Sequence, residues 1–287
     1  MKPELVAVLQ QFQVAELTDQ QIYTYMASKT TGQNRGLLEK MASDEARHVE
    51  IWNKYTGLPA APNRWKAAWF KVLFRIFGLT FVINMLKNGE ELAVEKYKPL
   101  LEDVPETLSI IADEHRHEQE LAAMIDEERL KYIGSMVLGL SDALVELTGA
   151  LAGFTLALGS NSTAGLAGFI TGVAATLSMA ASEYLSKKAD PAEKHPLKAA
   201  IYTGVAYLIT VALLLLPYAL TSSPYAALAL CLFNATCIIL VFTFFVSVVR
   251  REKMWPKFTE MVAISFGVAA ISFLIGLGAR IWLGLEL

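Results

Sequence analysis

The sequence is poor in cysteine. It has two, Cys231 and Cys237, among 287 residues, and both lie in an apolar stretch. Their spacing does not fit a Cys-x-x-Cys metal site, so we expect two free, buried thiols. The chain also lacks a cationic start followed by an apolar core and a small-residue cleavage site, and we therefore expect no signal peptide.

Charge is scarce in the second part of the chain. Residues 1–132 hold 20 of the 28 acidic residues and 16 of the 25 basic ones, and the longer remainder holds only eight acids and nine bases. Because a bilayer interior tolerates few charges, this asymmetry predicts a polar domain at 1–132 and a transmembrane domain at 133–287. No basic run occurs and the net charge is −3, so we expect no nucleic-acid partner.

Five apolar segments are long enough to cross a bilayer, which takes about 20 helical residues. We predict spans at 133–159, 163–186, 198–220, 225–249 and 258–284. Lysine and arginine precede the first span and gather in the second and fourth loops, whereas the first and third loops have none. The positive-inside rule then places residues 1–132 in the cytoplasm and the C-terminus outside.

A sixth apolar run, residues 67–86, is interrupted by Lys71 and Arg75. If it crossed the bilayer, the acidic motifs before and after it would lie on opposite sides and could not share a site. We therefore interpret residues 65–80 as an amphipathic segment at the membrane surface, with a sixth span as the alternative.

The pattern Glu-x-x-His occurs twice in the polar domain, as Glu45/His48 in SDEARHVE and as Glu114/His117 in DEHRHEQE. Spacing by three residues puts both side chains of a pair on one helix face. Carboxylate and imidazole ligands together suit iron or manganese. We interpret His115, between the second pair, as a surface residue.

A second pattern, Glu with Tyr seven residues later, precedes each copy: Glu16 with Tyr23, and Glu90 with Tyr97. Glu91 is an alternative to Glu90, but the Tyr97 register favours Glu90. Bundles that hold two iron or manganese ions use one Glu from each of two helices and Glu-x-x-His from each of the other two. The predicted metal ligands are Glu16, Glu45, His48, Glu90, Glu114 and His117, with Tyr23 and Tyr97 as hydrogen-bond donors behind them.

The sequence therefore predicts that the polar domain is an all-α four-helix bundle. Its helices are predicted at 4–31, 34–56, 79–98 and 104–131. We expect the last of them to run almost unbroken from Pro105 into the first span.

Two acidic residues lie inside the first predicted span, Asp142 and Glu146, and they share one helix face. Met179 and Glu183 repeat this spacing in the second span. Charges inside spans are costly and mark ion pathways, so we predict a divalent-cation path along these four residues. The alternative is a polar pair that is satisfied within the bundle. Glycines four apart in the same spans permit close helix contacts, within the chain or across a dimer.

Several segments resemble known families. AELTDQQIYTYMA, SDEARH, NGEELAVEKY and DEHRH resemble the rubrerythrin branch of the ferritin-like superfamily, and LGLSDALVELTGALAG and SMAASEYLS resemble the vacuolar iron transporter family. Together they resemble the membrane-bound ferritins, the erythrin–vacuolar iron transporter fusion family, over nearly the whole chain. The resemblance implies a ferritin-like four-helix bundle followed by a five-helix transmembrane domain.

The resemblance implies export of Fe2+ from the cytosol along Asp142, Glu146, Met179 and Glu183, with Mn2+ as the alternative metal. We expect exchange for protons, because carboxylates that release a metal ion can take up protons. The resemblance also implies two iron or manganese ions in the polar domain, a homodimer, and a bacterial inner membrane as the location. Ala93 replaces a further carboxylate of rubrerythrins, and their rubredoxin module is absent; both departures weigh against a peroxidase cycle. The alternative is a membrane-anchored di-iron oxidase or peroxidase, and a transporter whose head reacts with oxygen or peroxide combines the two.

Overall fold

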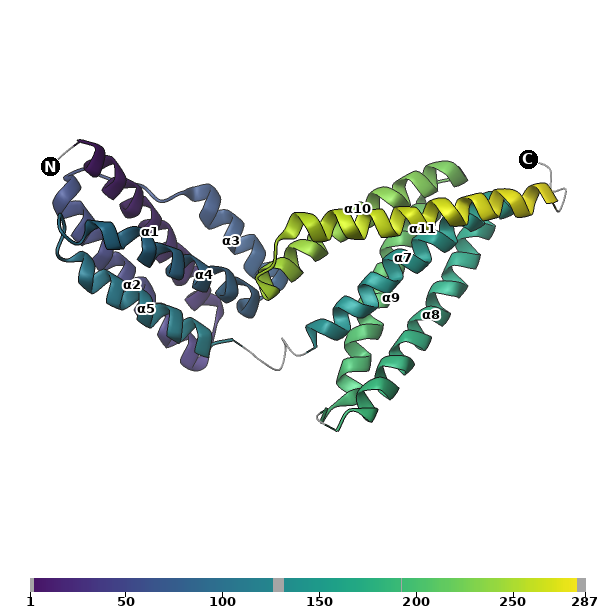
Figure 1. Ribbon diagram of the computed structural model, residues 1–287, viewed down its shortest axis with the longest axis horizontal. Coiled ribbons are helices and arrows are strands. Elements are labelled where there is room, and N and C mark those ends of the chain that lie inside the picture. The colour runs from purple at the N-terminus through teal and green to yellow at the C-terminus, as the bar shows by residue number, and fades with distance from the viewer. Residues whose placement is uncertain (1–2, 126–131, 192, 283–287) are drawn as a thin grey trace. The chain divides into compact units, whose positions relative to one another are not determined.

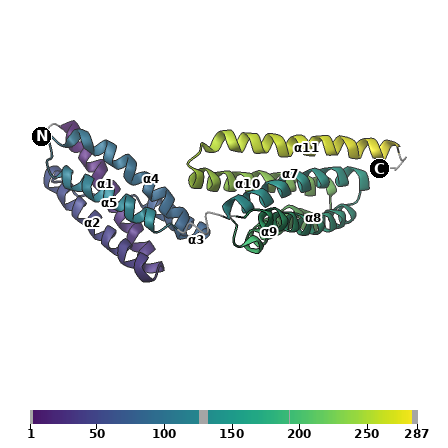
Figure 2. The same ribbon diagram turned by 60° about the horizontal axis from the view of Figure 1, so that its bottom comes forward.

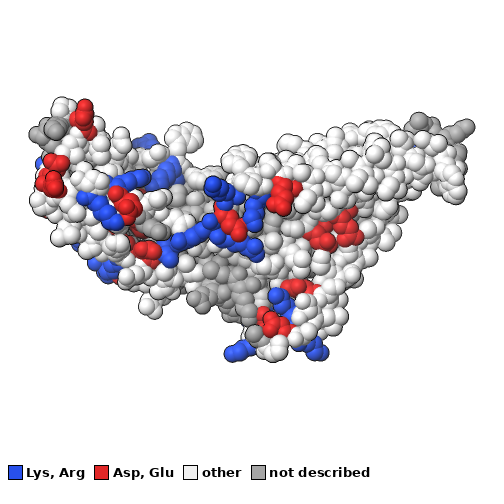
Figure 3. Space-filling view, in the orientation of Figure 1, with Lys and Arg blue, Asp and Glu red and all other residues white. Residues whose placement is uncertain are grey.

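The chain is all-α and forms two compact units, residues 1–126 and 127–287 (Figure 1). The computed structural model describes residues 3–125, 132–191 and 193–282. Charged side chains are spread over the surface of the first unit and are few on that of the second (Figure 3).

Four long helices and one shorter helix build the first unit. They are α1 (Pro3–Lys29), α2 (Gly32–Thr56), α3 (Arg64–Phe77), α4 (Leu79–Tyr97) and α5 (Thr107–Ala123), with a 3-10 turn at Lys98–Leu100. Helix α1 packs along α2, and α4 packs along α5, as two hairpins (Figures 1 and 2). Helix α3 packs on α1, and the Asn63 side chain caps it by accepting from the Lys66 N–H at 3.0 Å.

The apolar run 67–86 is broken at Gly78, whose φ of 81° and ψ of −175° a residue with a side chain would rarely adopt. Helix α3 therefore ends at Phe77 and α4 begins at Leu79. In the part of the chain that the structure describes, five helices are long and apolar enough to span a membrane, and none falls in this run. The alternative of a sixth span is wrong.

The predicted continuous helix from Pro105 into the first span is also wrong. Helix α5 ends at Ala123, Met124 forms a turn, and Ile125 is irregular; the rest of the predicted segment, 126–131, lies outside the described residues. The last buried apolar side chains here are Leu121 and Met124. Helices depend on such burial for stability, and in the described part of this unit it ends with Met124.

The second unit consists of the five predicted spans. They are α7 (Ile133–Leu158), α8 (Asn161–Ala189), α9 (Pro196–Leu220), α10 (Pro224–Arg250) and α11 (Met254–Trp282), with ends within a few residues of those predicted. Figure 2 shows α11 running alongside α7, and glycines permit the contact. A Cβ atom at Gly276 would lie 2.5 Å from the backbone oxygen of Gly153.

The glycine pairs are used inside one chain. Gly149 and Gly153 of α7 face α11, and Gly168 and Gly172 of α8 face side chains of α7 and α9. These glycines therefore give no support to a dimer interface. Cys231 is buried as predicted, but Cys237 is exposed, because a membrane helix is apolar toward lipid as well as toward its neighbours.

Candidate metal centre

The structure brings all six predicted ligands of the first unit together at its centre. Glu16 comes from α1, Glu45 and His48 from α2, Glu90 from α4, and Glu114 and His117 from α5; all are buried. Glu90 lies in this cluster; the side chain of the alternative, Glu91, lies outside the described residues. His115 is exposed, as expected.

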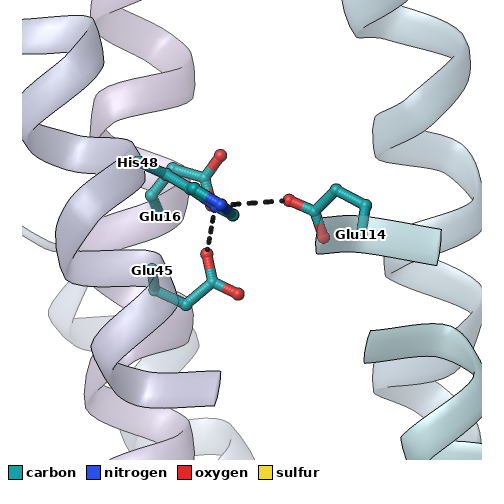
Figure 4. A group of neighbouring side chains, drawn as sticks. All are labelled: Glu16, Glu45, His48 and Glu114. Carbon is teal, nitrogen blue, oxygen red and sulfur yellow. Dashed lines mark ion pairs between the residues drawn. The ribbon is translucent and has the colours of Figure 1, made fainter. Parts of the chain in front are cut away.

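The six side chains form two overlapping groups. Within each group, one potential ligand atom per residue lies within 4.8 Å of the others, and the groups are Glu16, Glu45, His48 and Glu114, and Glu45, Glu90, Glu114 and His117. Figure 4 shows the first group, with Glu114 facing the other three residues from the opposite hairpin.

Glu45 and Glu114 belong to both groups and lie between the two imidazoles. The Nδ1 atom of His48 is 3.3 Å from Glu45 Oε2 and 3.6 Å from Glu114 Oε1. The Nδ1 atom of His117 is 3.3 Å from Glu45 Oε1 and 3.7 Å from Glu114 Oε2. Each of these carboxylates thus presents one oxygen to each histidine, which is the geometry of a bridging ligand.

The inward-facing atoms of this cluster lack hydrogen-bond partners. Both oxygens of Glu45, Oε2 of Glu114, and Nδ1 of His48 and His117 are fully buried and unsatisfied. Native proteins seldom leave buried polar atoms in this state, and carboxylate oxygens with imidazole nitrogens are a suitable donor set for divalent metals. The buried clusters could therefore hold metal ions.

The other nitrogen of each histidine contacts an aspartate from the opposite helix. His48 Nε2 lies 3.2 Å from Asp113 Oδ2, and His117 Nε2 lies 3.2 Å from Asp44 Oδ2. An aspartate acceptor keeps the proton on Nε2 and leaves Nδ1 free to bind a metal. Sequence reasoning did not assign these partners, although Asp precedes Glu in both copies of the motif.

Two arginines, also at equivalent positions of the two motifs, hold the aspartates. Arg116 donates to Asp44 Oδ2 and to Asp113 Oδ1, both at 2.6 Å, and Arg47 contacts the same two aspartates. Burial opposes ionisation of Asp44 and Asp113, but hydrogen bonds from the histidines and from Arg116 hold the pKa of both below its ordinary value.

The two tyrosines exchange hydrogen bonds between the repeats. Tyr97 donates to Glu16 Oε1 at 2.7 Å, and Tyr23 donates to Glu90. Each tyrosine therefore holds the glutamate of the other Glu-x6-Tyr repeat. Trp52 of α2 adds an N–H donor to Glu16 at 3.3 Å, which the sequence patterns did not indicate.

Crowding of the carboxylates separates their pKa values. Burial, with repulsion from neighbouring carboxylates, raises the pKa of Glu45 and Glu90 well above the usual value and that of Glu114 to about 8. Burial also opposes ionisation of Glu16, but its interactions with Glu45 and His48 and the hydrogen bond from Tyr97 outweigh it and lower its pKa to about 2. The cluster therefore retains protons that a bound cation would displace.

A cavity of about 240 Å³ borders the cluster. Its walls come from α1, α3, α4 and α5 and include Glu16, Glu90 and Glu114, as well as the exposed Lys96. It therefore connects the buried carboxylates with the surface of the unit. The small side chain of Ala93 also lines this cavity.

In the second unit the predicted acidic residues lie on two helices, α7 and α8, and Glu146 and Glu183 each have their own partner. Asp142 and Glu146 lie one turn apart on α7, and Tyr207 of α9 donates to Glu146 Oε2 at 2.9 Å. Glu146 is exposed on the surface of the single chain, whereas Glu183 is buried and accepts from Ser135 at 2.5 Å. Figure 3 shows a group of acidic atoms surrounded by uncharged surface on this unit, with other charged atoms elsewhere on it.

These acids do not form a closed cluster. Within the described part of the second unit, no three Asp, Glu, His or Cys side chains converge to metal-ligand distances. Met179 lies one turn from Glu183 and packs against the apolar core of the unit. The structure therefore offers separate positions along α7 and α8, and it does not offer one high-affinity site.

The comparison with known families finds a match within the second unit. A sequence model of the VIT family, the vacuolar iron transporters, matches residues 133–192 and 187–277, which together are half of the chain. The chain belongs to the VIT family. No curated protein and no solved structure matches it.

The VIT match begins at residue 133, where the transmembrane domain was predicted to begin. Asp142, Glu146, Met179 and Glu183 all fall in its first matched segment. VIT membership and five apolar helices indicate an integral membrane protein that transports a metal, iron or manganese.

Proposed function

We propose that the chain exports Fe2+, or Mn2+, from the cytosol and that its first unit is a ferritin-like, rubrerythrin-type head that holds two of these ions. One ion would bind Glu16, Glu45, His48 and Glu114, and the other would bind Glu45, Glu90, Glu114 and His117. One observation carries this proposal: two carboxylates, Glu45 and Glu114, lie between two histidines. The outer nitrogen of each histidine is held by an aspartate. Four carboxylates would balance the charge of two divalent cations.

The path across the membrane would use the acids of α7 and α8. Glu183, buried beside Ser135, would receive the ion together with Met179, and Asp142 and Glu146 would carry it further. A carboxylate that releases a metal ion can take up a proton, so exchange of metal for protons needs no additional groups. The Lys- and Arg-rich loops after α8 and α10 support a cytoplasmic head and an external C-terminus. The membrane proposed is a bacterial inner membrane.

The exposure of Glu146 supports a homodimer. Ionisable side chains within spans face a bundle interior or a water-filled cavity, because lipid solvates them poorly. In a single chain Glu146 lies on the outer surface, where Tyr207 donates a hydrogen bond to it. A second copy placed against this face would enclose the acid and complete the path.

Transport into proteoliposomes tests the proposal. Wild-type protein should move Fe2+ and respond to an imposed proton gradient, and Asp142→Ala should abolish uptake. Glu252→Gln, an acid in the α10–α11 loop that pairs with Lys257, is the matched control and should retain it. Glu45→Ala/His48→Ala then tests the head: lost flux means that the head supplies the metal, and altered flux means that it only regulates transport. Absence of Fe2+ and Mn2+ flux in the wild type would refute the transporter.

The cavity beside the cluster favours a second candidate, a membrane-anchored di-iron oxidase or peroxidase. It offers space for a small molecule next to Glu16, Glu90 and Glu114. Consumption of oxygen or peroxide by the iron-loaded wild type, lost in Glu45→Ala/His48→Ala, would support this activity. If this activity is found and metal flux is absent, the oxidase or peroxidase function replaces the proposed transport function. If both are found, the head has a ferroxidase or peroxide-sensing role beside transport.

A further inference from the structure

Helix α3 has two apolar faces. Ala67, Phe70 and Leu73 are buried against the rest of the unit. A second stripe faces outward at helical spacing, and its exposed fractions are 89% for Trp65, 53% for Trp69, 44% for Val72 and 65% for Ile76. A soluble surface helix buries one apolar face and presents polar residues elsewhere, so the outward stripe needs another explanation.

Positive charge accompanies this stripe. Helix α3 contains Arg64, Lys66, Lys71 and Arg75 and no acidic residue. Among the residues that the structure describes, no carboxylate pairs with Arg64, Lys71 or Arg75; the last two contact only the tyrosine Tyr25 of α1. These cations remain available to an anionic partner.

We propose that the outward stripe of α3 docks on an anionic bilayer surface. Tryptophan side chains favour the lipid–water interface, and neighbouring cations bind acidic headgroups, which is the pattern of an interfacial helix. The bilayer is near along the chain, because only nine residues separate the end of α5 at Ala123 from the start of the first span at Ile133. A second copy is a poorer occupant, since it would bring two sets of cations together.

Docking has a consequence for the cavity beside the metal cluster. Lys66 and Phe70 of α3 line this cavity, and Lys66 Nζ pairs with Asp19 Oδ1 of α1 at 2.8 Å. A helix fixed on the membrane would therefore hold one wall of the cavity at the membrane surface. The docking itself does not depend on the proposed transport function, and its test requires no metal bound to the protein.

Spin labels on the full-length chain in lipid nanodiscs test the proposal. In a Cys231→Ala/Cys237→Ala background, a nitroxide is attached at Ile76→Cys or, as the control, at Leu108→Cys on α5. The two native side chains are equally exposed, at 65% and 66%. Oxygen, which partitions into lipid, and a water-soluble nickel chelate then compete to relax each label.

In phosphatidylglycerol discs the oxygen-to-nickel accessibility ratio should be several-fold higher at position 76 than at position 108. Arg64→Gln/Lys71→Gln/Arg75→Gln, which leaves the buried face of α3 intact, should remove most of this difference, as should phosphatidylcholine discs. An aqueous label at 76 in anionic discs overturns the docking. Spin–spin broadening between copies without preference for oxygen also overturns it, in favour of a protein interface. An unchanged ratio in the triple variant overturns the role of the cations.

Discussion

The aspartate behind each histidine gives the sharpest test of the metal centre. In Asp113→Asn the side chain keeps its shape and one acceptor oxygen but loses the charge that His48 Nε2 faces at 3.2 Å. The proton is then held less firmly on Nε2, and the Nδ1 atom that points into the cluster becomes a weaker ligand. Asp44→Asn makes the same change behind His117.

The expected magnitude follows from the burial of this contact. The Asp113 side chain is only 12% exposed, so solvent screens its interaction with His48 little. Loss of such an outer partner weakens metal binding roughly 10- to 100-fold. This corresponds to about 1.4–2.8 kcal/mol. Because asparagine can still accept a hydrogen bond, Asp113→Asn should fall near the lower end and Asp113→Ala near the upper.

The two variants should affect different ions. Asp113→Asn should weaken the ion of the His48 group, and Asp44→Asn should weaken that of the His117 group. Calorimetric titration of the metal-free, full-length protein with Mn2+ under argon measures both affinities, with the exposed Asp103→Asn as control. Wild-type affinities in both variants, or equal weakening of both ions by either one, would refute the reasoning.

Further predictions concern protons, hydrogen bonds and helix contacts. Since the pKa of Glu114 is raised to about 8, the metal-free folded protein binds this proton more tightly than the unfolded chain does. The free energy of unfolding, measured by thermal unfolding in the presence of a chelator, should therefore fall as the pH rises from about 5 to above 8. Mn2+ affinity should change in the opposite direction and rise with pH. Tyr97→Phe removes the 2.7 Å donor to Glu16 and should cost about 1–3 kcal/mol in the same unfolding assay. Gly276→Ala should destabilise the membrane unit by about 1–3 kcal/mol, because its Cβ has no room, whereas Gly267→Ala, with nothing within 4 Å, should be tolerated; detergent unfolding compares the two.

The convergence of these six side chains could be predicted because its signals are local. A Glu-x-x-His pair fixes its own helix face, and the order of the repeats indicates which helices must meet. The cross-chain partners could not be predicted in this way. Whether Asp44 serves His48 or His117 depends on the lateral packing of α2 against α5, and the sequence contains no periodicity that reports it.

The spans could be predicted from apolar length, but the buried face of each span could not. In water an apolar side chain seeks the core, whereas in a bilayer lipid satisfies it equally well. The exposure of Cys237 and the use of Gly168 and Gly172 within the chain both follow from packing that hydropathy does not encode. The end of α5 at Ala123 was missed for a related reason, because helical periodicity alone does not show where burial stops.

The two units share one electrostatic problem, which is how to keep several carboxylates away from water. In the first unit, protons on Glu45, Glu90 and Glu114 relieve the repulsion between these carboxylates. A metal ion can bind there only by displacing these protons. Metal binding by the proposed head would therefore release protons. If the membrane path exchanges the metal for protons, both steps respond to pH in the same direction, because each favours metal on carboxylates when protons are few. Alkaline conditions should then load the head and favour entry of metal into the path together, so the head can report metal supply to the path without any conformational signal between the units.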